Sequence, residues 1–594
     1  MQRQRAHAGR HGPAILDSRT TRFRLWAPDA QKVSLSVVGA QTLPMSAEKD
    51  GWYSIDAPYG AGTLYRFLID DELEVPDPAS RAQAGDVHAP SVVVDHTGYR
   101  WRNAEWRGRP WHETVLYELH AGLYGGFAAV EQHLAGLVEL GVTAIELMPI
   151  AEFPGDRNWG YDGVLPYAPE AAYGSPEELK HLVDTAHGLG LMVFLDVVYN
   201  HFGPDGNYLG RYARHFFRHD QQTPWGDAID FRRREVRDFF IDNALMWLLD
   251  YRFDGLRLDA VHAIPDRSLL TELAERVHAT VEPGRHVHLV LENEDNRASL
   301  LAQGFTAQWN DDGHNVLHCL LTGEHQGYYA DYHREATGKL ARFLGEGFIY
   351  QGQNNRRGES RGEPSAHLPP TAFVLFLQNH DQTGNRAFGE RLVSLADAEA
   401  LRAATAVLLL SPMVPLLFMG EEWGARQPFL FFTSHHGELA DAVREGRRAE
   451  FAEFAEFAQF ADENVREHIP DPNALSTFED SRPDFSSHRE PGHVEWSALY
   501  RRLLQIRHRE IIPRLDGARF RGAQVLGDAA VLAHWWLGDH STLRLELNLG
   551  AAAVPLPAAP AAARLLFDSR EADAQRGQLP ARSARLYLEN AHER

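Results

Sequence analysis

The chain has 594 residues, of which 44% are apolar and 24% charged, a composition typical of a soluble globular protein of two or more domains. A formal net charge of −23 argues against nucleic acid or an acidic membrane surface as a partner and favours a neutral substrate. The single cysteine, Cys319, excludes an intramolecular disulfide, and the amino terminus lacks the apolar segment of a signal peptide, so we expect a cytoplasmic protein with no membrane span.

The first hundred residues predict a small β-sandwich. Runs such as TRFRLWAPDAQKVSLSV and GTLYRFLID alternate polar and apolar residues, and Gly, Pro and Asp, which are typical of turns, separate them. We therefore expect an amino-terminal β domain over residues 1–100.

From Val115 onward, apolar runs alternate with helix-length amphipathic segments, the pattern of βα units around a parallel sheet. This predicts an α/β fold, a (β/α)8 TIM barrel with insertions over residues 101–512; a doubly wound open sheet is the alternative. No glycine-rich phosphate loop follows any run, which counts against that alternative and against a nucleotide cofactor. The eight strand-like runs are VLYELHAG (115–122), TAIELMPI (143–150), MVFLDVVYNH (192–201), FDGLRLDAV (253–261), HVHLVLEN (286–293), FTAQWND (305–311), FVLFLQNHD (373–381) and VPLLFMGEEWG (414–424).

A long excursion, residues 425–491, follows the eighth run. After Pro513 the chain returns to β-like runs and an Ala- and Pro-rich stretch, which predicts a carboxy-terminal antiparallel β domain over residues 513–594. Within the excursion, the repeat FAEFAEFAQFAD places phenylalanines three residues apart. We expect a helix that packs this stripe against the barrel rather than a ligand site. The stripe consists of Phe451, Phe454, Phe457 and Phe460.

Charged residues interrupt the apolar run FDGLRLDAV. Residues two apart share a face of a strand, so Arg257 and Asp259 point one way while Leu256 and Leu258 point the other. In a barrel, helices cover the outer apolar face and polar side chains collect at the carboxyl ends of the strands. The pair either lines a site at that end or is a buried ion pair that stabilises the barrel.

Other predicted strands end in the same way. Polar side chains close the third, fifth and seventh runs, and carboxylates at the ends of several strands converge. Without a Cys or His cluster at metal-ligand spacing, converging acids indicate acid/base and covalent chemistry on a neutral, hydroxylated substrate, and glycoside hydrolysis fits best. We expect no cofactor and no required metal. The strand-end residues are Asp196, Asn200, His201, Glu292, His380 and Asp381.

The environments of two acids suggest different protonation states. Arg257 favours the ionised form of Asp259, which suits a nucleophile, whereas desolvation along VHLVLEN raises the pKa of Glu292, which suits a general acid. We expect their carboxyl groups about 5 to 5.5 Å apart, the spacing of a retaining enzyme. Glu294 and Asp295 are competing candidates for the acid, but they lie past the strand end and are expected to be solvated.

An aromatic segment, NWGYDG (158–163), follows the second predicted strand. Trp159 or Tyr161 would supply a surface for stacking on a pyranose ring. An aromatic pair that only packs the loop is an equal alternative.

Four motifs occur in the order in which the alpha-amylase superfamily of retaining glycosidases and transglycosylases has them, and the sequence resembles that superfamily. The motifs are DVVYNH (196–201), DGLRLDAVH (254–262), LEN (291–293) and QNHDQ (378–382). The resemblance implies Asp259 as the nucleophile, Glu292 as the acid/base and Asp381 as the carboxylate that fixes substrate hydroxyls. It further implies that the reacting sugar is held by Tyr161, His201, Arg257 and His380.

Longer segments, including QWNDDGHNVLHCLL and PLLFMGEEWGARQPFLFF, are similar to the maltooligosyltrehalose trehalohydrolase family. That resemblance implies an immunoglobulin-like amino-terminal sandwich of the carbohydrate-binding type. It also implies hydrolysis of the α-1,4 bond next to the terminal trehalose of a maltooligosaccharide. Trp225 and His262 are expected to contact the substrate beyond the cleaved bond. Asn200 resembles an amylase calcium ligand, but we expect it to form local hydrogen bonds instead.

Two other functions compete with this one. A glucan branching enzyme shares the fold and the covalent intermediate, and QNHDQTGNRA favours the trehalose-releasing group over it. An inactive glucan-binding protein is the alternative from another class. The presence of all three acids, Asp259, Glu292 and Asp381, argues against it.

Overall fold

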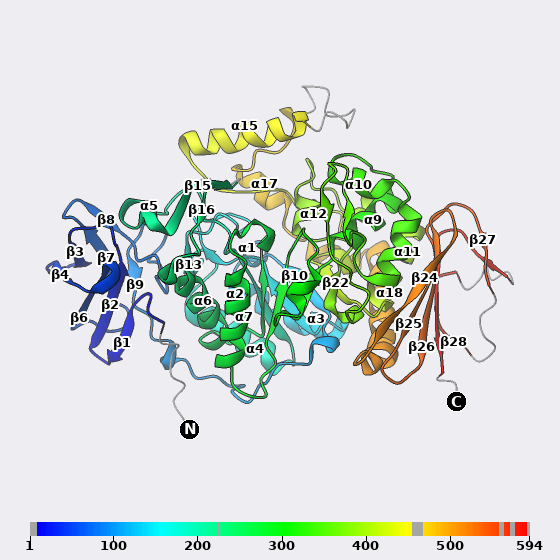
Figure 1. Cartoon of the computed structure of the whole chain (residues 1–594), viewed down its shortest axis with the longest axis horizontal. Coiled ribbons are helices and arrows are strands. Elements are labelled where there is room, and N and C mark those ends of the chain that lie inside the picture. The colour runs from blue at the N-terminus through cyan, green and yellow to red at the C-terminus, as the bar shows by residue number, and fades with distance from the viewer. Residues whose placement is uncertain (1–8, 224–225, 454–466, 558–562, 571–576, 591–594) are drawn as a thin grey trace.

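The computed structural model describes residues 9–223, 226–453, 467–557, 563–570 and 577–590 (Figure 1). At its centre, eight parallel strands close into a barrel in chain order, because β10 pairs with both β11 and β23. Each strand lies within one of the eight predicted runs, which confirms the (β/α)8 barrel. The strands are β10 (Leu116–Leu119), β11 (Ala144–Leu147), β14 (Met192–Val197), β17 (Gly255–Leu258), β18 (His288–Leu291), β19 (Ala307–Trp309), β22 (Phe373–Leu375) and β23 (Val414–Phe418).

Two antiparallel sheets precede the barrel and confirm the predicted β-sandwich. Alternate residues of their strands are buried, as Phe23 and Leu25 are in β2, so each sheet has one apolar face. One sheet has the order β1 (Ala14–Asp17), β2 (Thr20–Trp26), β6 (Trp52–Ala57), β5 (Ser46–Ala47). The other has the order β4 (Leu43–Pro44), β3 (Val33–Val37), β7 (Leu64–Ile69), β8 (Leu73–Val75), and β9 (Ser91–Val92) also pairs with β7.

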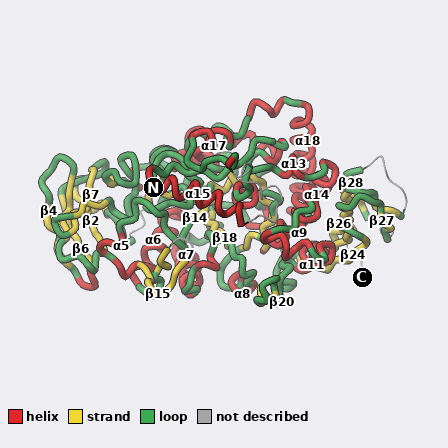
Figure 2. The backbone as a smooth tube through the Cα atoms, turned by 90° about the horizontal axis from the view of Figure 1, so that it is seen from above, coloured by secondary structure: helices red, strands yellow, loops and turns green. Residues whose placement is uncertain are grey.

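A five-stranded antiparallel sheet follows the barrel and confirms the predicted carboxy-terminal β domain. It packs against helices α11 (Ala336–Glu346) and α14 (Ala398–Leu410). Both views place this domain and the amino-terminal sandwich at opposite ends of the barrel (Figures 1 and 2). We propose domain boundaries near residues 100 and 512. The strand order is β24 (Arg519–Gly527), β25 (Ala530–Trp536), β26 (Thr542–Asn548), β30 (Ser583–Glu589), β28 (Arg564–Asp568).

Helices with one apolar face surround the barrel strands. The segment PEELKHLVDTAHG forms helix α4 (Pro176–Gly188), and Ser175 caps its start. The Ser175 hydroxyl accepts a hydrogen bond from the backbone N–H of Glu178, and the Glu178 carboxylate accepts one from the backbone N–H of Ser175. Among the described residues, no helix is both long and apolar enough to cross a membrane. The other long helices are α3 (Leu134–Leu140), α6 (Arg234–Leu249), α7 (Ser268–Thr280), α9 (Asp311–Thr322), α15 (Gly437–Glu453) and α18 (Pro491–Ile506).

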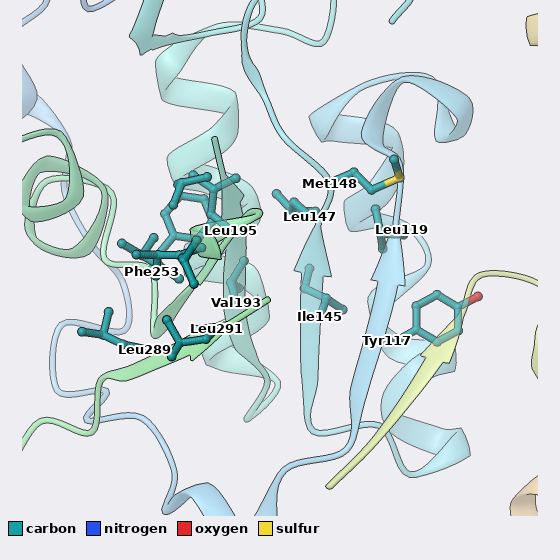
Figure 3. Packing of buried hydrophobic residues seen from close by; sticks show 14 of the residues in the cluster. Tyr117, Leu119, Ile145, Leu147, Met148, Val193, Leu195, Phe253, Leu289 and Leu291 are labelled. Carbon is teal, nitrogen blue, oxygen red and sulfur yellow. The ribbon is translucent and has the colours of Figure 1, made fainter. Parts of the chain in front are cut away.

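Most barrel strands contribute to two separate apolar clusters, whereas β17 contributes only to the outer one and β19 only to the inner one. Residues that point outward, such as Ile145, Val193 and Leu289, pack beneath the helices (Figure 3). Residues that point inward form a second cluster in the amino-terminal half of the barrel interior. Gly255 is required there because a Cβ atom would lie 2.1 Å from the Phe194 ring. The inner cluster contains Leu116, Ala144, Met192, Phe194, Val290, Ala307, Trp309, Val374, Phe376, Val414 and Leu416.

The phenylalanine stripe is described only in part. Phe451, in the last turn of α15, is buried in a small cluster with Ala387 and Ile469. This is the packing role expected for that residue. The remaining stripe residues, Phe454, Phe457 and Phe460, lie outside the described residues.

Candidate active site

A cavity of about 500 Å³ opens where the barrel strands end. Arg257 and His380 are buried next to side chains that line the cavity, and Trp225 lies outside the described residues. The structure therefore brings together every predicted site residue that it describes. Those that line the cavity are Tyr161, His201, Asp259, His262, Glu292 and Asp381.

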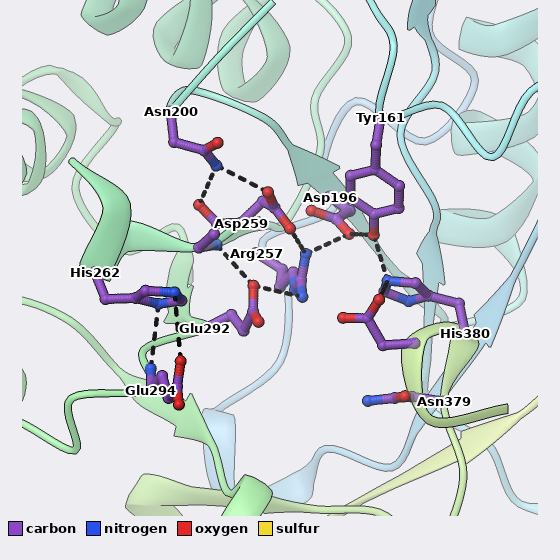
Figure 4. Close-up of polar contacts among 12 residues, drawn as sticks. Tyr161, Asp196, Asn200, Arg257, Asp259, His262, Glu292, Glu294, Asn379 and His380 are labelled. Atoms are coloured by element: carbon purple, nitrogen blue, oxygen red, sulfur yellow. Dashed lines mark hydrogen bonds and ion pairs between the residues drawn. The ribbon is translucent and has the colours of Figure 1, made fainter. Parts of the chain in front are cut away.

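Arg257 is the centre of the charged groups (Figure 4). Its Nη1 donates hydrogen bonds to Asp259 Oδ1 at 2.8 Å and to Asp196 Oδ2 at 2.7 Å. Its Nη2 lies 3.0 Å from Glu292 Oε2. The guanidinium is fully buried over the ring of Trp309, 4.3 Å from its centroid. Both readings of the Arg–Asp motif therefore hold, because Arg257 is a buried ion-pair partner and Asp259 faces the cavity.

Asp259 is held in its ionised form. Burial raises the pKa of its carboxyl, but Arg257, His201 and a 2.8 Å hydrogen bond from Asn200 outweigh burial and bring the pKa below its usual value. Asn200 also donates to the Asp259 carbonyl at 3.0 Å. The local hydrogen bonding expected of Asn200 is thus confirmed.

The pKa of Glu292 is shifted in the opposite direction to that of Asp259. Burial raises its pKa well above the usual range, Arg257 opposes the rise, and Asp259 and Asp381 add to it. Its side chain is 16% exposed, and its Oε2 accepts a hydrogen bond from the Ala260 backbone at 2.7 Å. Ala260 itself holds a left-handed backbone conformation, φ 39°, a region that non-glycine residues rarely adopt.

Glu294, the competing acid, is far more exposed than Glu292. Its side chain is 70% exposed, and its backbone N–H donates to His262 Nδ1 at 3.3 Å. Asp295 pairs with Arg267 and Arg297. Both residues therefore lie on the solvated loop where the sequence places them.

A second hydrogen-bonded chain runs from His380 to Arg257. His380 Nδ1 contacts the Glu118 carboxylate, and its Nε2 lies 2.7 Å from the Tyr161 hydroxyl oxygen. Tyr161 donates its hydroxyl proton to Asp196 Oδ2 at 2.6 Å, and Asp196 in turn accepts from Arg257. The Tyr161 ring stacks on His380, with ring centroids 5.1 Å apart. This aromatic residue therefore orders the site as well as lining it.

Trp159, His201 and Asp381 complete the parts of the site that the sequence indicated. Trp159 lines the cavity but is only 4% exposed, and it stacks on Phe429. His201 Nε2 lies 2.9 Å from the Tyr161 carbonyl oxygen. Asp381 has a side chain that is 39% exposed and lies 3.6 Å from His380 Nε2. Asp381 is thus the most accessible of the three predicted catalytic acids.

Several residues of the site were missed by sequence reasoning. Glu118 stands in the first strand, where a glutamate inside an apolar run was the available signal. One cavity wall comes from the segments after β19, which include the segment QWNDDGHNVLHCLL quoted above for its family resemblance, but sequence reasoning assigned none of its residues to the site. Tyr328 on this wall is 44% exposed, so an aromatic ring faces the open cavity. The other unpredicted lining residues include Asp311, Asn315, Asp331, Tyr332, Arg361 and Phe431.

Two family models match the chain. The alpha amylase catalytic domain matches residues 102–227, which include the first three barrel strands. A domain of unknown function, DUF3459, matches residues 518–586, which include most of the carboxy-terminal sheet.

Curated relatives extend the similarity along the whole chain. The malto-oligosyltrehalose trehalohydrolase of Rhizobium sp. (strain M-11) is 38% identical over 95% of this chain and 97% of its own. The chain belongs to the malto-oligosyltrehalose trehalohydrolase family. Another trehalohydrolase, from Deinococcus radiodurans, is 42% identical over 82% of this chain and 81% of its own. A 1,4-alpha-glucan branching enzyme from Jannaschia sp. is 36% identical over only 41% of this chain and 39% of its own.

Solved structures agree with this trehalohydrolase fold. An alpha-amylase-type protein from Salmonella typhimurium superposes with a TM-score of 0.93 at 45% identity, over 98% of this chain and 100% of that one. A pullulanase from Anoxybacillus sp. LM18-11 has a TM-score of 0.70 at 16% identity, over 99% of this chain and 88% of that one. The pullulanase shares the fold alone.

Proposed function

We propose that this protein hydrolyses the α-1,4-glucosidic bond next to the terminal trehalose of a maltooligosyltrehalose, releasing trehalose with retention of configuration. The observation that carries the chemistry is the contrast between Asp259 and Glu292. Both contact one buried guanidinium, yet the pKa of Asp259 is lowered and that of Glu292 is raised. Such a pair supplies a nucleophile and a proton donor at the same pH. The family membership supports the choice of bond.

The reaction proceeds in two displacements. Asp259 attacks the anomeric carbon while the Glu292 proton passes to the leaving oxygen, so the α-1,4 bond breaks and a glycosyl ester forms on Asp259. Glu292, now ionised, takes a proton from water, whose oxygen attacks the same carbon and releases Asp259. The second attack comes from the opposite face to the first, so the configuration is retained overall.

The other site residues are assigned to binding. Asp381 accepts hydrogen bonds from hydroxyls of the reacting sugar, His201 lines the cavity beside that sugar, and His380 acts on it through Tyr161, to which its Nε2 is bonded. Tyr161 supplies the aromatic surface. The exposure of Asp381 and the position of Tyr161 over His380 support these assignments.

Specificity for trehalose requires a pocket beyond the cleaved bond. We assign His262 to it, because this side chain lines the cavity next to Glu294. Trp225 remains a second candidate from the sequence. Trehalose and maltose differ only in how two glucoses are joined, so a pocket built for one leaves polar groups unpaired with the other, at about 1 to 3 kcal/mol each. Plain maltooligosaccharides should therefore be poor substrates.

Product analysis on two matched substrates tests the function. Maltotriosyltrehalose and maltopentaose have the same number of glucose units, and chromatography should show trehalose and maltotriose from the first at a rate about a hundredfold or more above cleavage of the second. Comparable rates on the two substrates, or no trehalose from maltotriosyltrehalose, would indicate a general amylase instead.

The stereochemistry is tested separately. Proton NMR of the first products, read before mutarotation, should show the α-anomer at the new reducing end of maltotriose. An initial β-anomer contradicts the double displacement, whatever the substrate preference.

A further inference from the structure

We propose that Glu118 is a positioning residue that holds His380 as an imidazolium, with one N–H directed at the hydroxyl oxygen of Tyr161, which lines the cavity. The effect on rate rests on the proposed function, whereas the protonation state of His380 does not. Glu118 lies on β10, and His380 is the first residue of α12 (His380–Gly384), 262 positions later in the sequence.

Glu118 binds His380 at two points. One carboxylate oxygen contacts the ring Nδ1, and the other accepts the His380 backbone N–H at 3.0 Å. Both side chains are only 1% exposed. Two contacts to one residue fix the position of its backbone as well as the rotation of its ring, so Glu118 determines where Nε2 points.

The hydrogen-bond donors determine the protonation state of the ring. Tyr161 has one hydroxyl proton, and it goes to Asp196 Oδ2, which also accepts from Arg257. The Tyr161 oxygen is therefore an acceptor toward His380, and Nε2, 2.7 Å away, must donate. Nδ1 faces the Glu118 carboxylate and must donate as well. A histidine that donates from both nitrogens is an imidazolium.

The raised pKa of His380 agrees with a ring that donates from both nitrogens. Burial lowers the pKa of His380, but Glu118 and Asp381 outweigh burial and raise it to about 9, with Arg257 opposing them. Burial raises the pKa of Asp196 to about 6, so Asp196 is ionised at neutral pH as the hydrogen bonds require. The titratable and charged groups around the ring are Glu118, His120, Glu146, Tyr161, Asp196, Arg257 and Asp381.

A matched control exists on the neighbouring strand. Glu146 on β11 pairs in register with Glu118 and is equally buried. Neither of its carboxyl oxygens has a hydrogen-bond partner among the described residues, and burial raises its pKa well above the usual range. Glu118→Gln and Glu146→Gln therefore each replace a buried glutamate by glutamine on neighbouring strands. Only Glu118→Gln removes a negative charge that faces His380, because the raised pKa keeps Glu146 protonated at neutral pH.

The direct test is ring nitrogen NMR on full-length protein labelled with ¹⁵N-histidine, with His380→Asn used to assign the signal. In the wild type, both His380 nitrogens should be protonated at pH 7. In Glu118→Gln, the titration midpoint should fall by about 1 to 3 pH units, the shift expected when a paired opposite charge is lost. In Glu146→Gln it should not move. A singly protonated wild-type ring, or an unchanged midpoint in Glu118→Gln, overturns the proposal.

Kinetics then separates positioning from general stability. The alkaline limb of kcat/KM should move to lower pH in Glu118→Gln, whereas Glu146→Gln should keep the wild-type profile. Glu118→Asp, which retains the charge, should restore the profile in part. Equal profiles for Glu118→Gln and Glu146→Gln contradict the proposal. If the ring titrates as expected but no variant, nor the wild type, releases trehalose, then the proposed function fails and the role of Glu118 toward His380 stands.

Discussion

The two halves of the barrel interior differ sharply although the same strands build both. The amino-terminal half is filled by apolar side chains such as Met192, Phe194 and Val290. The carboxyl half contains Glu118, Asp196, Arg257, Asp259, Glu292 and His380, most of them under 10% exposed. Trp309 joins the two halves, because Arg257 lies over its ring.

This difference separates stability from chemistry. Apolar side chains in a closed interior lower the free energy of folding through burial, whereas buried charges raise it unless each one is paired. In the carboxyl half the pairing is shared: Arg257 contacts three carboxylates and His380 contacts Glu118. Substitutions in the two halves should therefore affect different measurements.

The largest effect is expected at the two acids that face the cavity. Asp259→Asn and Glu292→Gln should each lower kcat by about 10³-fold or more, because each removes a covalent or proton-transfer role, while the circular dichroism spectrum stays that of the wild type. Glu294→Gln is the matched control and should change kcat only slightly. If Glu294→Gln were inactive and Glu292→Gln active, the general acid would be Glu294 and the assignment of Glu292 would be wrong.

The next effect is expected in the apolar half. Phe194 is fully buried, so Phe194→Ala should lower the free energy of unfolding by about 3 to 5 kcal/mol in urea titrations. At a temperature where the variant is folded, kcat should be close to that of the wild type. Leu16, which is 49% exposed, provides the control, and Leu16→Ala should change stability by less than about 0.5 kcal/mol.

A smaller effect is expected at the rim of the cavity. His262→Ala should reduce the preference for maltotriosyltrehalose over maltopentaose by about tenfold, because one polar contact to trehalose is lost. The ratio of the two kcat/KM values measures this. An unchanged ratio would place trehalose recognition elsewhere on the cavity wall, such as at Tyr328 or Asp311.

The smallest effect concerns stability and pH. The folded-state pKa of Glu292 is raised, so the folded protein keeps a proton that the unfolded chain loses above about pH 4.3, and the free energy of unfolding falls as the pH rises toward the folded pKa. Glutamine cannot ionise, so Glu292→Gln does not lose stability in this way as the pH rises. Thermal melts should show a higher Tm than the wild type at pH 7 and no such gain at pH 4. A lower Tm at pH 7 would mean that the ion pair with Arg257 stabilises the fold.

The sequence predicted the barrel because each strand is a short apolar run and each strand end is polar. Alternation within FDGLRLDAV was enough to place Arg257 and Asp259 inside and Leu256 outside. The role of Glu118 was not predictable in this way, because its partner is 262 positions away and only the closed barrel brings the two together. Tyr328 and Asp311 were missed for a different reason. Asp311 begins α9 and Tyr328 lies in a single turn of 3-10 helix, and the apolar periodicity of such segments does not show which polar or aromatic side chains face a cavity.

Closure of the barrel through β10 and β23 has a consequence for the nascent chain. The register of these strands joins Leu116 to Leu416, so the first strand has no partner on one side until about 300 more residues have left the ribosome. At about 5 to 20 residues per second, this takes roughly 15 to 60 s. During that interval β10 presents an open strand edge that carries Glu118. Because a charged side chain is costly to bury without a partner, we expect Glu118 to discourage wrong strand pairing at this edge before His380 has been synthesised.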